Sequence, residues 1–362
     1  RSNMKPLLRE HIVGLEPQGG AIRFFCSHRA QILSYEVDLN GRCAVRMAAG
    51  RSSLEDIRAA LPSPVPLDDI RSFFSFLSQE RIVRDASRDD TDRFEPGYEA
   101  RLQRQIAYLS GVASGNDSGR TLQARLRGSR VIIVGAGGGG SHLAVQLAGI
   151  GVGELVIVDG DRVEVGNLGR QIYYAGQVGD WKVNALKRFL GQLAPETTVT
   201  TRIAFLGPSS EWLDELVPGS DLVSNCADQP SMDETSRWLF DSCYKHRVPL
   251  IPAGGYNGHM TSLPPTLIPG KSTCWPCYER AGAGRPSIRD FGLQLSSVNA
   301  GIFLPGTIAM AALQMPEIVR VLTSYEPPRF MNLRGDFDLN LCRLTTEAVP
   351  PTPGCGQCEG TA

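Results

Sequence analysis

The sequence predicts an α/β protein built on a doubly wound, mainly parallel β-sheet, with a small separate domain in front of it. Two observations support this prediction. From Ser129 onward, short β-branched strand patterns alternate with amphipathic helix patterns, and a glycine-rich loop follows the first strand. Alternation of this kind favours parallel strands joined by right-handed helical crossovers. The chain of 362 residues is long enough for such a domain and a second module.

Residues 1–88 are predicted to form a small winged-helix domain. The stretches "AIRFFCSH" and "QILSYEVDL" have the aromatic and β-branched content of paired strands. A first helix is expected to begin near Ser53, a good N-cap residue. A second helix places apolar residues at i, i+3, i+4 and i+7, counted from Ile70, and the stretch "RIVR" closes the domain as a short strand.

The second of these helices, "PLDDIRSFFSFLSQE", is mildly acidic. This disfavours nucleic acid as the ligand of the domain, because a recognition helix for nucleic acid carries basic residues. An exposed strand edge that captures a peptide by β-augmentation fits the composition better. A structural appendage without a ligand is the alternative.

Residues 89–128 are predicted to be a linker with a helical arm. The stretches "RDASRDDTDR" and "SGVASGNDSGRT" have the composition of linkers. Between them, "YEARLQRQIAYL" is predicted to form a short helix.

Residues 129–362 carry the repeated strand and helix patterns. The predicted strands are "RVIIVG", "ELVIVD", "TVTTRIA", "DLVSNCAD" and "PLIPAG". The predicted helices between them are "SHLAVQLAGIG", "DWKVNALKRFLGQL", "SSEWLDELV" and "MDETSRWLFDSCYKH". The later apolar tract from Val298 to Met315 is interrupted by glycine and proline, so a buried core helix with its lead-in is expected there and a membrane span is not.

The composition disfavours several classes of partner. The formal net charge is −1 and long basic runs are absent, so nucleic acid and anionic membranes are not expected to bind. The first residues lack the apolar core of a secretion signal, and nine cysteines are an odd number, which argues against a disulfide framework. We therefore expect a cytoplasmic protein that acts on a small molecule or a peptide.

Four of the cysteines form two C-x2-C pairs, Cys274 with Cys277 and Cys355 with Cys358. Each pair brings two thiolates to one metal from a tight turn, and two pairs complete a tetrahedral zinc shell with no open position for water. We predict a structural zinc ion that holds the C-terminal segment against the domain. Reactive or coincidental thiols are the alternative interpretation.

The glycine-rich stretch "VGAGGGGSH" places Gly135, Gly137 and Gly140 in the pattern G-x-G-x-x-G between a strand and a helix. In a Rossmann-like domain, this turn directs amide donors and a helix N-terminus at phosphate. Asp159 ends the next strand, where an acidic residue binds a ribose hydroxyl. Taken alone, these residues are compatible with an NAD-dependent oxidoreductase.

Polar and charged residues beyond Asp159 favour ATP over NAD. They are Asp161, Asn167, Arg170 and Gln171 in "DGDRVEVGNLGRQ", followed by Lys182. A neutral nicotinamide ring needs no such charges, whereas Arg170 and Lys182 could neutralise a triphosphate and the departing pyrophosphate while an aspartate holds Mg²⁺. Asp228 follows another strand, at the sheet edge where ligands of open α/β sheets bind. Surface ion pairs are the alternative interpretation.

Residues 101–358 resemble the ubiquitin-activating, or E1-like, superfamily of adenylating enzymes, which includes the ThiF, MoeB and HesA proteins. Its pattern is a glycine-rich loop, an aspartate that ends strand two, an N-L-x-R-Q element, a lysine, an aspartate after strand four, and two zinc knuckles. The matching residues here are Gly135, Gly137, Gly138, Gly140, Asp159, Asn167 to Gln171, Lys182, Asp228 and the four paired cysteines. The stretch "RLQRQI" also resembles the family's R-x-x-R-Q-I segment.

The resemblance implies a homodimer with composite sites, in which Arg104 of "RLQRQI" reaches into the ATP site of the partner subunit. The implied ligands are Asp159 for the ribose, Asn167, Arg170 and Lys182 for the phosphates, and Asp228 for Mg²⁺. A substrate carboxylate would attack the α-phosphorus of ATP, which yields an acyl-adenylate and pyrophosphate.

Departures from the superfamily pattern narrow the expected substrate. Members that form a thioester or persulfide use a cysteine in the segment after the first knuckle, and "ERAGAGRPSIRDFGLQLSSVNAGIF" contains none. Cys226 and Cys243 lie in strand and helix patterns, where a small buried side chain is the expected role. The segment from Glu279 to Ser297 is rich in glycine and arginine, and either a substrate loop or an ordinary surface connection is compatible with it.

The N-terminal domain resembles the PqqD-like leader-peptide recognition domains of ribosomal-peptide maturation systems in "AAGRSSLEDIRAAL" and "LDDIRSFFSFLSQERIV". Together the two resemblances predict an enzyme that adenylates a carboxylate of a precursor peptide in antibiotic biosynthesis. A closer resemblance, to the peptide-maturation branch of the superfamily, implies glutamate side chains as the targets, followed by cyclisation with loss of water. The alternatives are adenylation of a peptide C-terminus, activation of a ubiquitin-like sulfur carrier, an NAD-dependent oxidoreductase, and a non-catalytic scaffold that binds leader peptides.

Overall fold

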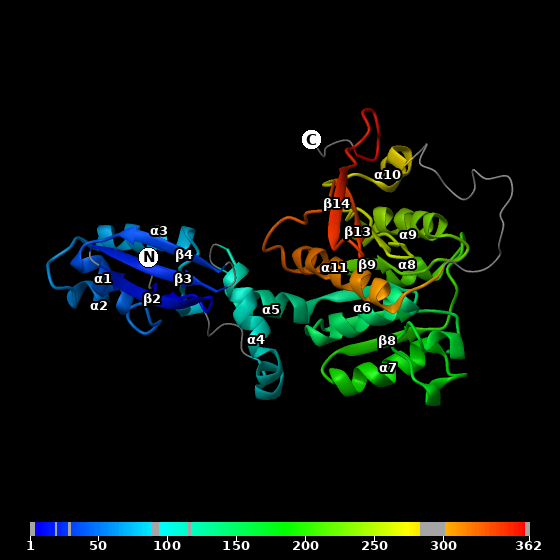
Figure 1. Ribbon diagram of the computed structural model, residues 1–362, viewed down its shortest axis with the longest axis horizontal. Coiled ribbons are helices and arrows are strands. Elements are labelled where there is room, and N and C mark those ends of the chain that lie inside the picture. Colours follow the sequence, from blue (N-terminus) through cyan, green and yellow to red (C-terminus); the bar gives the residue numbers. More distant parts are fainter. Residues whose placement is uncertain are drawn as a thin grey trace. The chain divides into compact units, whose positions relative to one another are not determined.

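The chain divides into two compact units, residues 1–125 and residues 126–362 (Figure 1). The computed structural model describes residues 4–18, 20–27, 30–88, 94–114, 117–282 and 301–358. The first unit contains the predicted winged-helix domain and most of the predicted helical arm. The predicted boundary between these two parts at residue 88 stays a prediction.

The first unit is built around a three-stranded antiparallel sheet in the order β2-β3-β4. Its strands are β2 (Ile12–Gln18), β3 (Ala21–Cys26) and β4 (Gln31–Glu36). A separate antiparallel pair consists of β1 (Pro6–Leu8) and β5 (Val83–Asp85), and the helices are α1 (Leu39–Arg46), α2 (Leu54–Ala59) and α3 (Leu67–Gln79). The predicted β3–β4 pair, α2, α3 and β5 are confirmed, whereas β1, β2 and α1 have no counterpart in the prediction.

Helix α2 begins where the sequence predicts, because Ser53 caps it. The backbone amide of Asp56 donates to Ser53 Oγ at 3.2 Å, and the amide of Ser53 donates to Asp56 Oδ2 at 2.9 Å. The apolar faces of the helices meet the sheet in one core, in which Phe24, Ile57 and Phe74 are each at most 1% exposed. The unit therefore has a hydrophobic core of its own.

Two further helices, α4 (Pro96–Val112) and α5 (Gly119–Gly128), follow β5. Helix α4 is longer than the predicted "YEARLQRQIAYL", because Pro96 provides a favourable first turn. Arg9 joins α4 to the strand pair. Its buried guanidinium donates to the Val83 carbonyl at 3.3 Å and to the Ser110 carbonyl at 2.6 Å. These bonds offset part of the cost of burying a charge.

The second unit is a doubly wound α/β domain, as the sequence predicts. Its parallel sheet has the order β10-β9-β6-β7-β8. The strands are β6 (Arg130–Val134), β7 (Glu154–Val158), β8 (Thr198–Arg202), β9 (Leu222–Asn225) and β10 (Leu250–Ile251). The helices between them are α6 (Gly138–Gly149), α7 (Lys182–Leu193), α8 (Trp212–Leu216) and α9 (Met232–His246).

The chain starts the sheet at β6 and adds strands first on one side of it and then on the other. The order of the strands therefore reverses at β6. Right-handed crossovers then place α6 and α7, which contact each other, on one face of the sheet, while α8 and α9 share a core cluster with side chains of β6 and β7 on the other. Both faces are covered, so β6 is apolar after Arg130, and Val131, Ile132 and Ile133 are at most 1% exposed. In open sheets of this type, ligands bind at the carboxyl ends of the strands beside the reversal.

A second sheet of four antiparallel strands lies in the same unit, and the sequence analysis does not predict it. The strands are β11 (Tyr256–Asn257), β12 (Met260–Leu263), β13 (Leu333–Asp338) and β14 (Arg343–Ala348). The helices of this part are α10 (Trp275–Gly282) and α11 (Leu304–Thr323). Helix α11 contacts α6 and β12, so the predicted core helix is confirmed. In the described part of the chain, helices long and apolar enough for a membrane span are absent.

Replacement of Gly140 by alanine is expected to destabilise the second unit. A Cβ atom at Gly140 would lie 1.8 Å from the carbonyl oxygen of Gly135, so backbone would have to move. We expect the free energy of unfolding to fall by about 2 kcal/mol or more. Gly149→Ala in the same helix is the control, because a Cβ there meets nothing within 4 Å. Denaturant unfolding of both variants would contradict this account if Gly140→Ala were as stable as Gly149→Ala.

Candidate active site and cysteine cluster

The glycine loop crosses the carboxyl end of β6 in close contact with its neighbours. Gly135 has a φ of +97°, and a Cβ there would lie 2.6 Å from the backbone of Cys226, so a side chain would not fit. Its amide donates to the Val158 carbonyl at 2.7 Å. Helix α6 then begins at Gly138, and its N-cap, Gly137, supplies no side-chain hydrogen bond to the first amides. Those amides are suited to an anion such as phosphate.

Asp159 lies immediately after β7 and faces this loop. Its Oδ2 accepts a hydrogen bond from the Ala136 amide at 2.6 Å, and its Oδ1 accepts one from the Asp161 amide at 2.7 Å. Burial raises the pKa of the Asp159 carboxyl above its ordinary value, although nearby Lys182 and the two amide bonds oppose that shift. The carboxylate is thus held beside the glycine loop, where the sequence predicts the residue that binds a ribose hydroxyl.

Lys182 reaches the same place from the start of α7. A short antiparallel contact pairs Arg162 with Trp181, and the Lys182 amide donates to the Asp161 carbonyl at 3.0 Å. The Lys182 ammonium lies 2.7 Å from Asp161 Oδ2, with its side chain 7% exposed against 52% for Asp161. The sequence predicts both residues for the site but not this pairing. The sequence signal for this ion pair is a pair of acidic residues on either side of a glycine at the end of a strand, followed by a lysine at the start of the next helix.

The Asn167–Gln171 element packs against the glycine loop. Asn167 is buried, and its Oδ1 accepts the Glu164 amide at 2.9 Å, so this side chain closes its own turn. Gln171 is also buried, and its Nε2 lies 3.8 Å from the Cβ position of Gly137. In the described residues, Gln171 Oε1 has no hydrogen-bond partner. Arg170, between them in the chain, is half-buried.

Tyr173 is a further residue of this site that the sequence analysis does not single out. It is buried, and its hydroxyl donates to the Ala136 carbonyl at 2.8 Å, which ties the Asn167–Gln171 element to the glycine loop. Burial raises the pKa of Tyr173 above its ordinary value, so the hydroxyl stays a donor. The aromatic pair that follows "GRQI" is the only sequence signal for it.

Asp228 is exposed and follows β9 at the same edge of the sheet. The loop that carries it is held by Asn225, whose Nδ2 donates to Thr235 Oγ1 and Ser236 Oγ, each at 3.0 Å. Arg104 is an exposed residue of α4 in the first unit, and its predicted role in a partner's site stays a prediction. In the segment from Glu279 to Ser297, residues 283–297 lie outside the described residues.

Neither Cys226 nor Cys243 has the environment of a nucleophile. Burial raises the pKa of the Cys226 thiol to about 12, and burial also raises the pKa of Cys243. A thiol with a raised pKa remains protonated at neutral pH and reacts slowly. Cys243 is buried, in agreement with the expected role of a small buried side chain, whereas Cys226 is half-buried and lies just after β9.

The four paired cysteines converge from α10 and the C-terminal segment. All four are buried, and their Sγ atoms lie within 4.8 Å of one another. Cys274 and Cys355 are 3.6 Å apart, and Cys277 and Cys358 are 3.7 Å apart. Four sulfur ligands at about 2.3 Å from one tetrahedral zinc are separated by about 3.8 Å. The Thr352 amide also donates to Cys277 Sγ at 3.2 Å. This donor set fits a structural zinc ion.

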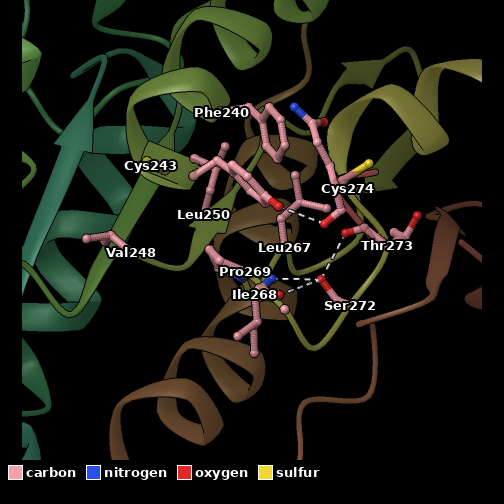
Figure 2. A pocket seen from close by; sticks show the side chains of 13 residues that line it. Phe240, Cys243, Val248, Leu250, Leu267, Ile268, Pro269, Ser272, Thr273 and Cys274 are labelled. Carbon is pink, nitrogen blue, oxygen red and sulfur yellow. Dashed lines mark hydrogen bonds between the residues drawn. The ribbon is translucent and has the colours of Figure 1, made fainter. Parts of the chain in front are cut away.

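A small cavity lies behind Cys274 (Figure 2). Its volume is about 10 Å³, which is room for about one water molecule. Figure 2 shows Phe240, Leu250 and Leu267 lining it, with Ser272 on its polar side. Ser272 Oγ accepts the Ile268 amide at 2.7 Å and donates to the Thr273 carbonyl at 2.9 Å. The cavity is therefore a small gap among the residues that pack behind Cys274, and it is too small for a substrate.

Comparison with known proteins gives concordant results. The sequence model of the ThiF family matches residues 102–357. The chain is 35% identical to the adenylyltransferase and sulfurtransferase uba4 of Aspergillus terreus over 208 residues, or 56% of this chain and 41% of that protein. It is 30% identical to the molybdopterin-synthase adenylyltransferase of Salmonella typhimurium over 238 residues, or 65% of this chain and 89% of that protein. The chain thus spans less than half the length of its uba4 relative.

Solved structures share the fold over nearly the whole chain. E. coli MccB with ATP is 22% identical with a TM-score of 0.76 and covers 98% of this chain and 99% of its own. The microcin C7 biosynthetic enzyme MccB with N-formylated MccA is 21% identical with a TM-score of 0.77 and the same coverage. PaaA is 22% identical with a TM-score of 0.69 and covers 93% of this chain and 98% of its own.

Purified protein is expected to contain about one zinc ion per chain, and Cys358→Ser is expected to lose it, because three thiolates leave the tetrahedral shell open. The matched control is Cys342→Ser, since Cys342 is exposed and outside the cluster. Elemental analysis together with thermal unfolding checks both. Equal zinc content in the two variants, or none in the wild-type protein, would refute the zinc assignment.

Proposed function

The chain belongs to the ThiF family, and from this premise we propose that it is an ATP-dependent adenylating enzyme acting on a carboxylate of a precursor peptide. The observation that carries the proposal is the convergence of the glycine loop, Asp159 and Lys182 at the carboxyl edge of the parallel sheet. Amides without a side-chain cap at the start of α6 and a buried ammonium suit a triphosphate. A dinucleotide carries two phosphates and a neutral nicotinamide ring, so it offers that ammonium less negative charge than a triphosphate does.

Most polar groups of the site have a ligand in this proposal, and Asp161 pairs with Lys182. Asp159 binds the ribose, and the α6 amides with Asn167, Arg170, Gln171 and Lys182 hold the phosphates. Asp228 would hold Mg²⁺, which would neutralise charge on the departing pyrophosphate. Positioning and electrostatic stabilisation supply most of the rate, because the reaction at phosphorus needs no covalent group from the enzyme.

The first unit offers a place for a peptide. A groove of about 510 Å³ lies between strands β3 and β4 and helices α1 and α3. Strand β4 is the edge of its sheet in the described structure, so its backbone is open to pairing with an extended peptide. Apolar side chains line the groove, and Glu36, Asp38 and Asp69 lie among them. These features support a leader segment with apolar and basic residues as the ligand.

The fate proposed for the acyl-adenylate rests on two observations: the segment after the first cysteine pair contains no cysteine, and burial raises the pKa of the Cys226 and Cys243 thiols. A nitrogen of the same peptide would attack the activated carbonyl, form an amide and release AMP, so that cyclisation removes water overall. The sequence also resembles the pantocin A biosynthetic enzyme, which supports glutamate side chains as the activated groups. MccB has been solved with the peptide MccA, which supports a peptide as the substrate class. Homodimerisation and a structural zinc ion belong to the same proposal.

A second candidate function is activation of a sulfur-carrier protein. The observation that favours it is the sequence similarity to uba4 and to the molybdopterin-synthase adenylyltransferase. That reaction activates a carrier's C-terminal carboxylate, so it predicts activity with a protein that ends in two glycines rather than with a short peptide.

The test is pyrophosphate release from ATP and Mg²⁺, with the mass of the acceptor measured in parallel. A short peptide encoded beside the gene is expected to cause release and to lose water. Gain of AMP by the peptide would indicate adenylation of its C-terminus instead. Release with a carrier protein but with no neighbouring peptide would refute the peptide-maturation proposal.

Mixing two inactive variants tests the composite site. Arg104→Ala and Asp228→Ala are each expected to be inactive alone, while mixed dimers contain one site with both residues intact. Roughly a quarter of the wild-type rate is expected, because half of the dimers are mixed and half of their sites are complete. Lys182→Ala mixed with Asp228→Ala is the control and should stay inactive, since both residues belong to the same site. No recovery in the first mixture would mean that Arg104 does not act across a dimer.

A further inference from the structure

We propose that Arg162 and Trp181 are positioning residues, which form a clamp that fixes Lys182 at the site. This inference rests on the proposed function, because it concerns the ammonium group that holds the phosphates there. The guanidinium carbon of Arg162 lies 3.8 Å from the centroid of the Trp181 ring. A cation this close to an indole is attracted by the negative face of the ring. We call this contact the Arg162–Trp181 clamp.

The clamp lies at the base of the loop of residues 164–178, which carries the Asn167–Gln171 element. The segments that enter and leave this loop, residues 161–163 and 179–182, pair in antiparallel fashion. Three backbone hydrogen bonds of 2.8 to 3.0 Å join the two segments. A two-stranded ladder this short is only marginally stable in water. Its geometry therefore depends on the side chains that bridge it.

Arg162 bridges the two segments twice. Besides the contact with the Trp181 ring, its Nη1 donates to the Gly179 carbonyl at 2.6 Å. Arg162 is exposed and Trp181 is half-buried, so the clamp lies at the surface of the domain and outside its hydrophobic core. Loss of the clamp should therefore alter this corner of the site without unfolding the domain.

Trp181 is the N-cap residue of α7, but its side chain does not cap the helix. A serine at this position could accept a hydrogen bond from the first amides of the helix, whereas an indole is only a donor. The ring of Trp181 therefore contributes through its contact with Arg162 and not through capping. Replacement by serine separates these two contributions.

Lys182 is the first residue of α7, so its backbone follows the ladder. Its ammonium lies 2.7 Å from Asp161 Oδ2, but the Asp161 side chain is 52% exposed, and an ion pair open to solvent on one side holds a flexible lysine only weakly. Asp161 and Lys182 lie on the two opposite segments of the ladder. The clamp thus sets the place of the ammonium by holding those segments together.

The test uses the full-length protein with ATP and Mg²⁺, measured by equilibrium binding and by pyrophosphate release. Trp181→Ser is expected to raise the Kd and the KM for ATP about three- to ten-fold, the range that one cation–π contact can supply. Arg162→Lys should have a similar effect, because an ammonium lacks the planar face and the fork of a guanidinium. Trp181→Phe keeps an aromatic face and should restore most of the affinity.

Arg188→Ala is the matched control. Arg188 forms an ion pair with Asp180 of the same ladder, and both side chains are largely exposed, so its loss should leave ATP binding as in the wild type. A merely structural role of Trp181 would reduce the amount of folded enzyme, and so the apparent kcat, without raising the KM. That result, or an equal rise of the KM in Arg188→Ala, would contradict the clamp.

The reactivity of Lys182 toward acetic anhydride, followed by mass spectrometry in the absence of ATP, is an independent measurement. The Lys182 side chain is 7% exposed, so it should react slowly in the wild type and faster in Trp181→Ser. An unchanged rate would mean that the clamp does not position Lys182. If the wild type binds ATP and Trp181→Ser binds it equally well, the inference is wrong and the proposed function stands. If the wild type binds no ATP, both are wrong.

Discussion

The site depends on one close approach of backbone to backbone, between the glycine loop and the start of α6. The carbonyl oxygen of Gly135 occupies the place where any side chain at Gly140 would begin. Because the loop is this tight, α6 starts directly above the end of β6, and its first amides point at the sheet edge. Asp159 then bonds to the same loop, and Tyr173 holds the Asn167–Gln171 element against it. The polar groups converge because the loop has no room for side chains.

The parts of the fold that are local in sequence could be predicted from it. The parallel sheet follows from alternating strands and helices, and the two C-x2-C pairs predict a shared cluster although 81 residues separate the paired sulfurs. The second sheet was not predictable for two reasons. Its neighbouring strands β12 and β13 are separated by about seventy residues in the chain, and all residues of β14 are exposed, so this strand lacks the apolar and polar alternation of a half-buried strand. Likewise α1 is short and contains an Asn-Gly pair, which is typical of turns.

The sequence predicts which residues belong to the site better than it predicts which of them contact one another. The sequence places Asp161 and Lys182 at the same edge, but the ion pair depends on the antiparallel contact between Arg162 and Trp181. The role of Arg104 is predicted from a sequence motif alone, and it concerns the ATP site of a second subunit.

In the proposed function, the first unit would capture a peptide along an edge strand, and the second would activate a carboxylate at the edge of a parallel sheet. The most direct measurement labels the carboxylates of the precursor peptide with ¹⁸O and follows the label after reaction with ATP. Attack on the α-phosphorus transfers one labelled oxygen to AMP, and this is the predicted result. Label in inorganic phosphate would mean attack on the γ-phosphorus, and unlabelled AMP would mean that the peptide carboxylate is not the nucleophile. Either outcome would contradict adenylation of the peptide.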